Sequence, residues 1–142
     1  MSQEDNIDVV RRIYATGCWE SDGDPRLAFP LLDDTFEFHN PEYAVVPGMR
    51  RGHRGFATAM HNQLDAFERF SHRPISFEAV GDDRVIARCH VTALGRMSAI
   101  EVEHAEWHVW TVRDGRAYRV TWYRTRDEAW QDATDGRPAP KE

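Results

Sequence analysis

Two histidines and a glutamate lie within five residues in the segment HAEWH, residues 104–108. Imidazole and carboxylate groups bind metal ions, and they also transfer protons in enzymes that work near neutral pH. On a helix, His104 and His108 would be neighbours roughly 6 Å apart, as zinc-binding histidines often are. On a strand they would point to the same side but lie about 13 Å apart, at ~3.3 Å per residue. The chemistry of the segment therefore depends on the element that carries it.

The residues around HAEWH favour a strand. The run IEVEHAEWHVWTV, residues 100–112, is rich in β-branched and aromatic residues and leads into an Asp-Gly turn. On a strand, His104 and His108 are too far apart to share one metal ion, because imidazole ligands must come within about 2.1 Å of it. Cys18 and Cys89 are far apart, and no other Cys or His pair has metal-ligand spacing. The sequence therefore predicts no metal and no cofactor.

The elements that position this strand follow from the spacing of apolar residues. Helical spacing predicts three helices before the sheet, at residues 6–19, 22–32 and 55–70. A strand ending at Pro41 lies between the second and third helices. Alternating runs separated by turn residues predict four antiparallel strands, at residues 73–80, 83–94, 98–113 and 116–125. A last helical turn at 126–133 completes one α+β domain over residues 1–133, and a flexible polar tail follows at 134–142.

Composition excludes several classes of protein. The chain has 142 residues and a formal net charge of −6, so it lacks the basic surface that nucleic-acid binding requires. No apolar run approaches the ~18 residues that a membrane span needs. With two cysteines and an acidic start, MSQEDN, the sequence shows neither a disulfide scaffold nor a secretion signal. We therefore expect a cytoplasmic protein.

The order of the elements and three motifs resemble the SnoaL-like members of the nuclear-transport-factor-2-like superfamily. The motifs are DGDPRLAFPLLDDTFEFHNP, PGMRRGHRGF and EWHVWTVRDGRAYRVTWY, and the resemblance covers residues 6 to about 130. It implies a cone in which the curved sheet encloses a pocket against the helices. Cyclases, isomerases, epoxide hydrolases and non-catalytic binding domains share this fold, and many of them pair through the outer face of the sheet.

Neither of two well-known sets of catalytic residues in this superfamily is complete here. In ketosteroid isomerases, the resemblance places a catalytic Asp where this chain has Asn40, an oxyanion donor at His108, and a tyrosine donor near Tyr14. An amide cannot take a proton from carbon, so Asn40 argues against that isomerase chemistry. In limonene-type epoxide hydrolases, Arg88 matches the catalytic arginine, but the two catalytic acids are replaced by His90 and Trp122.

Strand alternation then gives a candidate site. If His108 faces the pocket, Glu106 and Trp110 share its face, and we expect Arg88 and His90 to complete the polar patch from the adjacent strand. The candidate catalytic residues are Arg88, His90, Glu106 and His108. The candidate ligand-binding residues are Tyr14, Phe38, Asn40, Met60, Trp110 and Trp122. The alternative is that the four charged residues form a solvated cross-strand cluster with no chemical role.

Two classes of function follow. The first is a cofactor-free acid–base catalyst, such as a cyclase, isomerase or hydrolase, acting on a small and largely apolar substrate such as a polyketide-like metabolite. The second is a non-catalytic ligand-binding or dimerisation module, which the bulky Trp122 in place of a catalytic acid favours. The apolar stripe of the outer face predicts a homodimer through Trp107, Val109, Thr121 and Tyr123.

Overall fold

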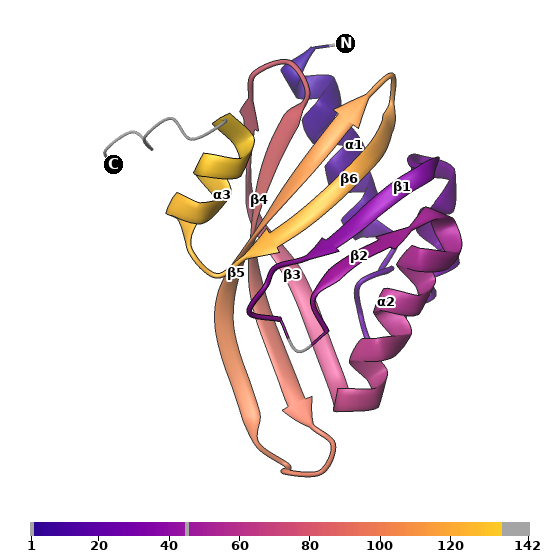
Figure 1. The fold of residues 1–142 in the computed structure, drawn as a ribbon, viewed down its shortest axis with the longest axis vertical. Helices are drawn as coiled ribbons and strands as arrows, with labels where there is room; N and C mark the ends of the chain where they lie inside the picture. The colour runs from indigo at the N-terminus through magenta and orange to yellow at the C-terminus, as the bar shows by residue number, and fades with distance from the viewer. Residues whose placement is uncertain (1, 45, 135–142) are drawn as a thin grey trace.

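Ten elements follow one another in the computed structural model, which describes residues 2–44 and 46–134 (Figure 1). The helices are α1 (Gln3–Ala15), the 3₁₀-helix η1 (Pro25–Leu31), α2 (Gly52–Ala66) and α3 (Arg126–Thr134). The strands are β1 (Leu32–Asn40), β2 (Gly48–Arg51), β3 (Phe67–Val80), β4 (Arg84–Gly95), β5 (Glu101–Arg113) and β6 (Arg116–Tyr123). The predicted α+β class is confirmed, and HAEWH lies within β5.

The six strands form one curved sheet in the order β2-β1-β6-β5-β4-β3. All neighbours are antiparallel except β1 and β6, which run parallel and are separated in the chain by five elements, β2, α2, β3, β4 and β5. The sheet separates α1 and α2, which cover its inner face, from α3, which lies against its outer face (Figure 1). The hairpin of β4 and β5 extends beyond the other strands (Figure 1).

The end of the third predicted helix is wrong. The helix α2 ends at Ala66, and the residues that follow it belong to β3. Phe67 already has extended backbone angles, with φ −125° and ψ 135°. Phe70 and His72 are buried two residues apart, which is strand periodicity and places both side chains on the inner face. The predicted flexible tail, residues 134–142, lies outside the described residues apart from Thr134, which ends α3 and is buried.

Along β5, the side chains alternate as the sequence predicts. Glu106, His108 and Trp110 are buried on the inner face, and Trp110 belongs to the main core with α1 and α2. Trp107 and Val109 point to the outer face, where they pack with α3 in a second, smaller cluster. The Glu106 carboxylate therefore lies on the face of β5 that the helices cover.

The helix α3 covers part of the apolar stripe that suggested a homodimer. Ala129 is fully buried against Val109 and its neighbours, and Trp107 and Tyr123 pack at the edge of the same cluster. Burial under α3 therefore accounts for a portion of this apolar surface without a second chain. The homodimer stays a prediction. None of the helices in the described residues is long and apolar enough to cross a membrane.

Packing of α3 on the sheet predicts a face-dependent effect of substitution. Ala129→Asp would place a carboxylate in an apolar contact with no partner, and we expect the free energy of unfolding to fall by about 2–3 kcal/mol. Gln131→Asp introduces the same residue on the exposed side of the same helix, and it should change stability by less than about 0.5 kcal/mol. Urea denaturation followed by tryptophan fluorescence measures both values. Equal losses would mean that α3 does not pack as described.

Candidate acid–base site

Four side chains form a continuous hydrogen-bonded chain on the inner face of the sheet. The indole N–H of Trp110 donates to the Tyr14 hydroxyl at 2.9 Å, and that hydroxyl hydrogen bonds to His108 Nδ1 at 2.5 Å. On the other side of the imidazole, Nε2 lies 2.9 Å from Glu106 Oε1. Three of these residues come from alternate positions of β5, and Tyr14 comes from α1. Proton transfer along such a chain needs no movement of heavy atoms.

The Glu106 carboxylate is surrounded by imidazole rings. In addition to His108, Nε2 of His104 lies 3.1 Å from Oε2, and Nε2 of His72 lies 3.7 Å from Oε1. Glu106 is 7% exposed, His72 is 8% exposed and His108 is fully buried, whereas the His104 side chain is 43% exposed. His104 therefore marks the side from which solvent or a small molecule approaches the carboxylate.

Trp19 covers the two buried imidazoles. Its indole stacks on His108 with ring centroids 4.2 Å apart and on His72 at 4.8 Å. Trp19 lies in the turn between α1 and η1, where Gly17 has φ +74° and a Cβ at Gly23 would lie 1.9 Å from the Gly17 carbonyl oxygen. The next residue, Glu20, accepts hydrogen bonds from Ser71 Oγ and from the His72 backbone N–H. The turn is thus held to β3.

Electrostatics favour a charged pair at the centre of the site. Burial disfavours the Glu106 carboxylate, but hydrogen bonds from His104 and His108 outweigh it and hold the Glu106 pKa well below its usual range. Burial also disfavours the His108 imidazolium, but Cys89, 3.5 Å from Nδ1, and Glu106 outweigh it and raise the pKa of His108 to about 9. A fully buried imidazolium is stable only beside such an anion. For His72, burial dominates and lowers the pKa to about 4, so this ring is neutral at pH 7.

The structure separates the predicted catalytic residues. Glu106 and His108 meet as expected, but the placement of Arg88 and His90 beside them is wrong. In the register of β4 with β5, Cys89 lies opposite Glu106 and Arg88 lies opposite Trp107, so Arg88 and His90 belong to the outer face. The sequence carries the signal, because the inward positions of β4 are all apolar: Val85, Ala87, Cys89, Val91 and Ala93.

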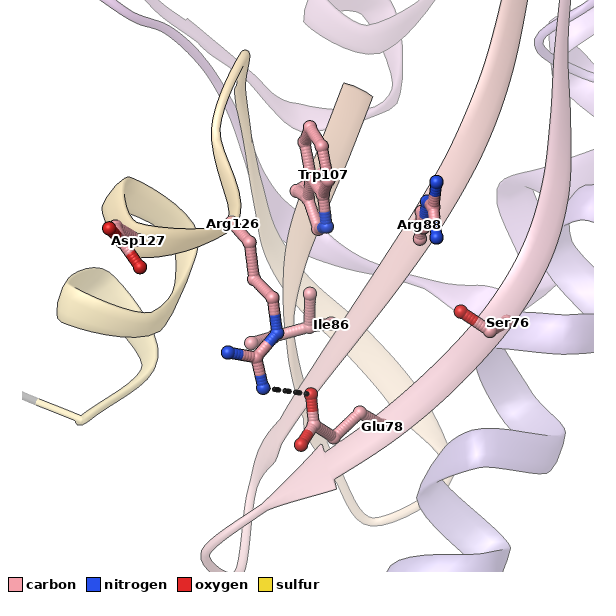
Figure 2. A pocket seen from close by; sticks show the side chains of 7 residues that line it. All are labelled: Ser76, Glu78, Ile86, Arg88, Trp107, Arg126 and Asp127. Carbon is pink, nitrogen blue, oxygen red and sulfur yellow. Dashed lines mark hydrogen bonds and ion pairs between the residues drawn. The ribbon is translucent and has the colours of Figure 1, made fainter. Parts of the chain in front are cut away.

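On the outer face, Arg88 and His90 have other neighbours. The Arg88 guanidinium lies 5.8 Å from the centre of the Trp107 ring, and both residues line a groove of about 740 Å³ beside α3 (Figure 2). Across that groove, Arg126 of α3 pairs with Glu78 at 3.5 Å (Figure 2). His90 Nε2 lies 3.1 Å from Glu103. His90 therefore fits the alternative interpretation, in which the charged residues form a solvated cross-strand cluster.

The predicted ligand-binding residues lie on the inner side. Phe38, Met60 and Trp110 are buried in the main core, and Tyr14 joins the hydrogen-bonded chain. Asn40 Oδ1 accepts a 2.7 Å hydrogen bond from the indole of Trp122, so the two residues fix each other at the end of β1. Their roles in ligand binding stay predictions.

Sequence reasoning missed Trp19 and His72. His72 falls between the predicted helix at 55–70 and the predicted strand at 73–80, yet its alternation with Phe70 in β3 identifies it as inward. Trp19 lies in a turn without periodicity, and nothing in its local sequence indicates the contact. The metal prediction is also open: within residues 2–44 and 46–134, no three His, Cys, Asp or Glu side chains are arranged to hold an ion.

The sequence matches the family model for the SnoaL-like domain over residues 10–120. The chain belongs to the SnoaL-like family. This match covers both strands of the site and Tyr14 of α1. No curated protein matches the chain.

Solved structures agree on the fold of this SnoaL-like chain. TerC, co-crystallised with polyporic acid, superposes with a TM-score of 0.73 at 21% identity, over 93% of this chain and 99% of TerC. A nuclear-transport-factor-2-like protein of unknown function from Burkholderia pseudomallei gives 0.73 at 18% identity, over 94% and 99%. A candidate SnoaL-like polyketide cyclase from Jannaschia gives 0.72 at 16% identity, over 95% and 94%. The nuclear-transport-factor-2-like fold is thereby confirmed.

The His108–Glu106 pair predicts a loss of stability at high pH. Because the folded-state pKa of His108 is above its ordinary value of about 6.5, its contribution is fully present below that pH and is lost as pH rises through about 9. This loss should be on the order of 2–3 kcal/mol. Urea denaturation between pH 6 and pH 9.5 should show a decline that His108→Gln removes, whereas His61→Gln, on the exposed side of α2, keeps it. The same decline in His108→Gln would refute the charged pair.

Proposed function

We propose that this SnoaL-like protein is a cofactor-free acid–base catalyst that acts on a small, largely apolar substrate. The observation that carries the proposal is the hydrogen-bonded chain from Tyr14 through His108 to Glu106, enclosed by aromatic rings. Acid–base catalysis needs a proton donor and a proton acceptor with different proton affinities in one water-poor site. An imidazolium and a carboxylate on one strand face supply both.

In the donor half of the site, Tyr14 is the group that touches the substrate. When His108 is charged, its Nδ1–H and the Trp110 N–H both point to the Tyr14 oxygen. The Tyr14 O–H is then left to donate to a substrate oxygen, where it stabilises negative charge as it develops. His108 lies behind Tyr14 and can replace the proton that Tyr14 gives up.

The acceptor half is the Glu106 carboxylate. Its Oε2 atom is bound by His104, the most exposed of the three histidines. A substrate that displaces His104 removes one hydrogen bond that lowers the Glu106 pKa and excludes water, and both changes make the carboxylate a stronger base. The carboxylate then takes a proton from carbon beside a carbonyl, the C–H electrons form the enolate, and Tyr14 stabilises the enolate oxygen.

Two of the similar structures support a cyclic, polyketide-like substrate. TerC was crystallised with polyporic acid, and the Jannaschia protein is described as a candidate polyketide cyclase. The inner face of this chain carries rings that suit such a compound, among them Trp19, Phe38 and Trp110.

A non-catalytic binding protein is the second candidate. It is favoured by Asn40, which cannot act as a base and is held by Trp122. It is also favoured by the complete burial of His108 beneath Trp19. This function requires the same aromatic surroundings but no proton transfer.

Deuterium exchange tests the proposed function without knowledge of the natural substrate. The α-protons of 2-tetralone, a small ketone fused to a benzene ring, should exchange with D₂O faster in the presence of the protein, as ¹H NMR measures. Glu106→Gln should slow the catalysed exchange by about 10²–10⁴-fold, because it removes the base. Glu78→Gln changes the same residue type on the outer face, where Glu78 pairs with Arg126, and it should leave the rate unchanged.

Arg88→Ala belongs to the same experiment. Since Arg88 lies on the outer face, this variant should also keep the full rate. Full activity in both Glu106→Gln and His108→Gln would place the chemistry elsewhere. Binding of 2-tetralone by the wild-type protein without exchange would favour the non-catalytic function.

A further inference from the structure

Two polar atoms next to the acid–base chain are buried without a hydrogen-bond partner. Within the described part of the chain, Trp19 Nε1 and His72 Nδ1 make no hydrogen bond, although the residues are only 2% and 8% exposed. The Trp19 backbone acts to raise the pKa of His72, but it forms no hydrogen bond of ordinary geometry with Nδ1. Buried polar groups are almost always paired in proteins, so atoms like these indicate where a ligand or water binds.

The two atoms belong to neighbouring rings. The rings of Trp19 and His72 stack with an angle of 26° between their planes. The Trp19 indole also stacks on His108, whose ring centroid lies 5.8 Å from that of His72. A group that bonded to both atoms would therefore lie beside the imidazole of the proposed catalytic chain.

A groove of about 730 Å³ is lined by residues that adjoin the two rings in the chain, Glu20 after Trp19 and Ser71 before His72. Its walls include Glu20, which follows Trp19 and binds the His72 backbone, and Phe70, whose ring meets His72 edge-on at 5.8 Å. Ala93 and Val102 add apolar surface from β4 and β5. This volume is in the range of small-molecule sites and accommodates a compound of two or three rings.

Hydrogen-bonding rules fix the chemistry that the two atoms would recognise. Trp19 Nε1–H can only donate. The His72 ring is neutral, and its Nε2 faces the Glu106 carboxylate, which only accepts, so the proton belongs on Nε2 and Nδ1 is left as an acceptor. One donor and one acceptor together match a hydroxyl group, which accepts one hydrogen bond and donates another.

We infer that Trp19 Nε1 and His72 Nδ1 bind a hydroxyl group of the substrate, and that the substrate is a planar phenol or enol whose ring lies in the groove of Glu20, Phe70, Ala93 and Val102. This inference rests on the proposed function for the position of the site and adds the substrate class. Trp19 and His72 are specificity residues in it, because they orient the ring while Tyr14, His108 and Glu106 perform the chemistry.

NMR of the indole N–H groups tests the inference directly. The probes are 2-naphthol and naphthalene, which differ only in the hydroxyl. In ¹⁵N-labelled wild-type protein, 2-naphthol should move the Trp19 indole resonance downfield, and naphthalene should not. Trp130 is the internal control, since its Nε1 is also buried without a partner but belongs to α3 and packs on the outer face of the sheet. No movement of Trp19 with 2-naphthol, or equal movement with both probes, would overturn the inference.

Affinities of matched variants give a second measurement. Trp19→Phe keeps a stacking ring but lacks the N–H, and it should weaken 2-naphthol about 5- to 10-fold while leaving naphthalene unchanged. His72→Asn places an amide at the Nδ1 position and should retain most of the affinity, whereas His72→Gln places it at the Nε2 position and should lose as much as Trp19→Phe. An unchanged ratio of 2-naphthol to naphthalene affinity in Trp19→Phe would contradict the assignment, as would a crystal structure with 2-naphthol bound and only water on both atoms.

The two proposals fail in different ways. If the hydroxyl makes no difference to binding but Glu106→Gln still abolishes exchange of 2-tetralone, the recognition pair is wrong and the catalytic proposal stands. If the hydroxyl is recognised but Glu106→Gln exchanges normally, the groove binds phenols without the proposed chemistry.

Discussion

The negative charge of Glu106 is the constraint around which the inner face of this protein is arranged. A carboxylate that is 7% exposed is stable only if several donors reach it. Three histidines from two strands do so, and their hydrogen bonds and charges hold it ionised. In turn, Cys89 and Glu106 together raise the pKa of His108 in a place where burial alone would lower it. Two further side chains contact the imidazole of this pair: Tyr14 hydrogen bonds to it and Trp19 stacks on it, while Trp110 donates a hydrogen bond to Tyr14.

The same carboxylate connects the two histidines of HAEWH. On the strand β5, His104 and His108 lie two positions before and two positions after Glu106, so their rings do not reach each other. The carboxylate bridges them with one oxygen directed to each. An anion between two imidazoles favours their protonated forms, whereas a metal cation between them would bind the neutral rings as ligands. The spacing of five residues therefore favours acid–base chemistry over metal binding.

Sequence reasoning succeeds here where one strand carries the information. The alternation of β5 was enough to place Glu106, His108 and Trp110 on one face, and the family resemblance was enough for the fold. It failed for Arg88, because the face of β4 depends on its register with β5, although the apolar residues at alternate positions of β4 indicate its inner face. It failed for Trp19 and for the Tyr14–His108 bond, since a turn has no periodicity and the two bonded residues are 94 positions apart.

The hydrogen bonds of Glu20 give the Trp19 turn a mechanical property. One carboxylate ties the turn both to a side chain and to the backbone of β3, at the residue before His72 and at His72 itself. Trp19 and His72 are thus linked through the main chain as well as through their stacked rings. A displacement of the indole is therefore transmitted through Glu20 to β3, the edge strand of the sheet.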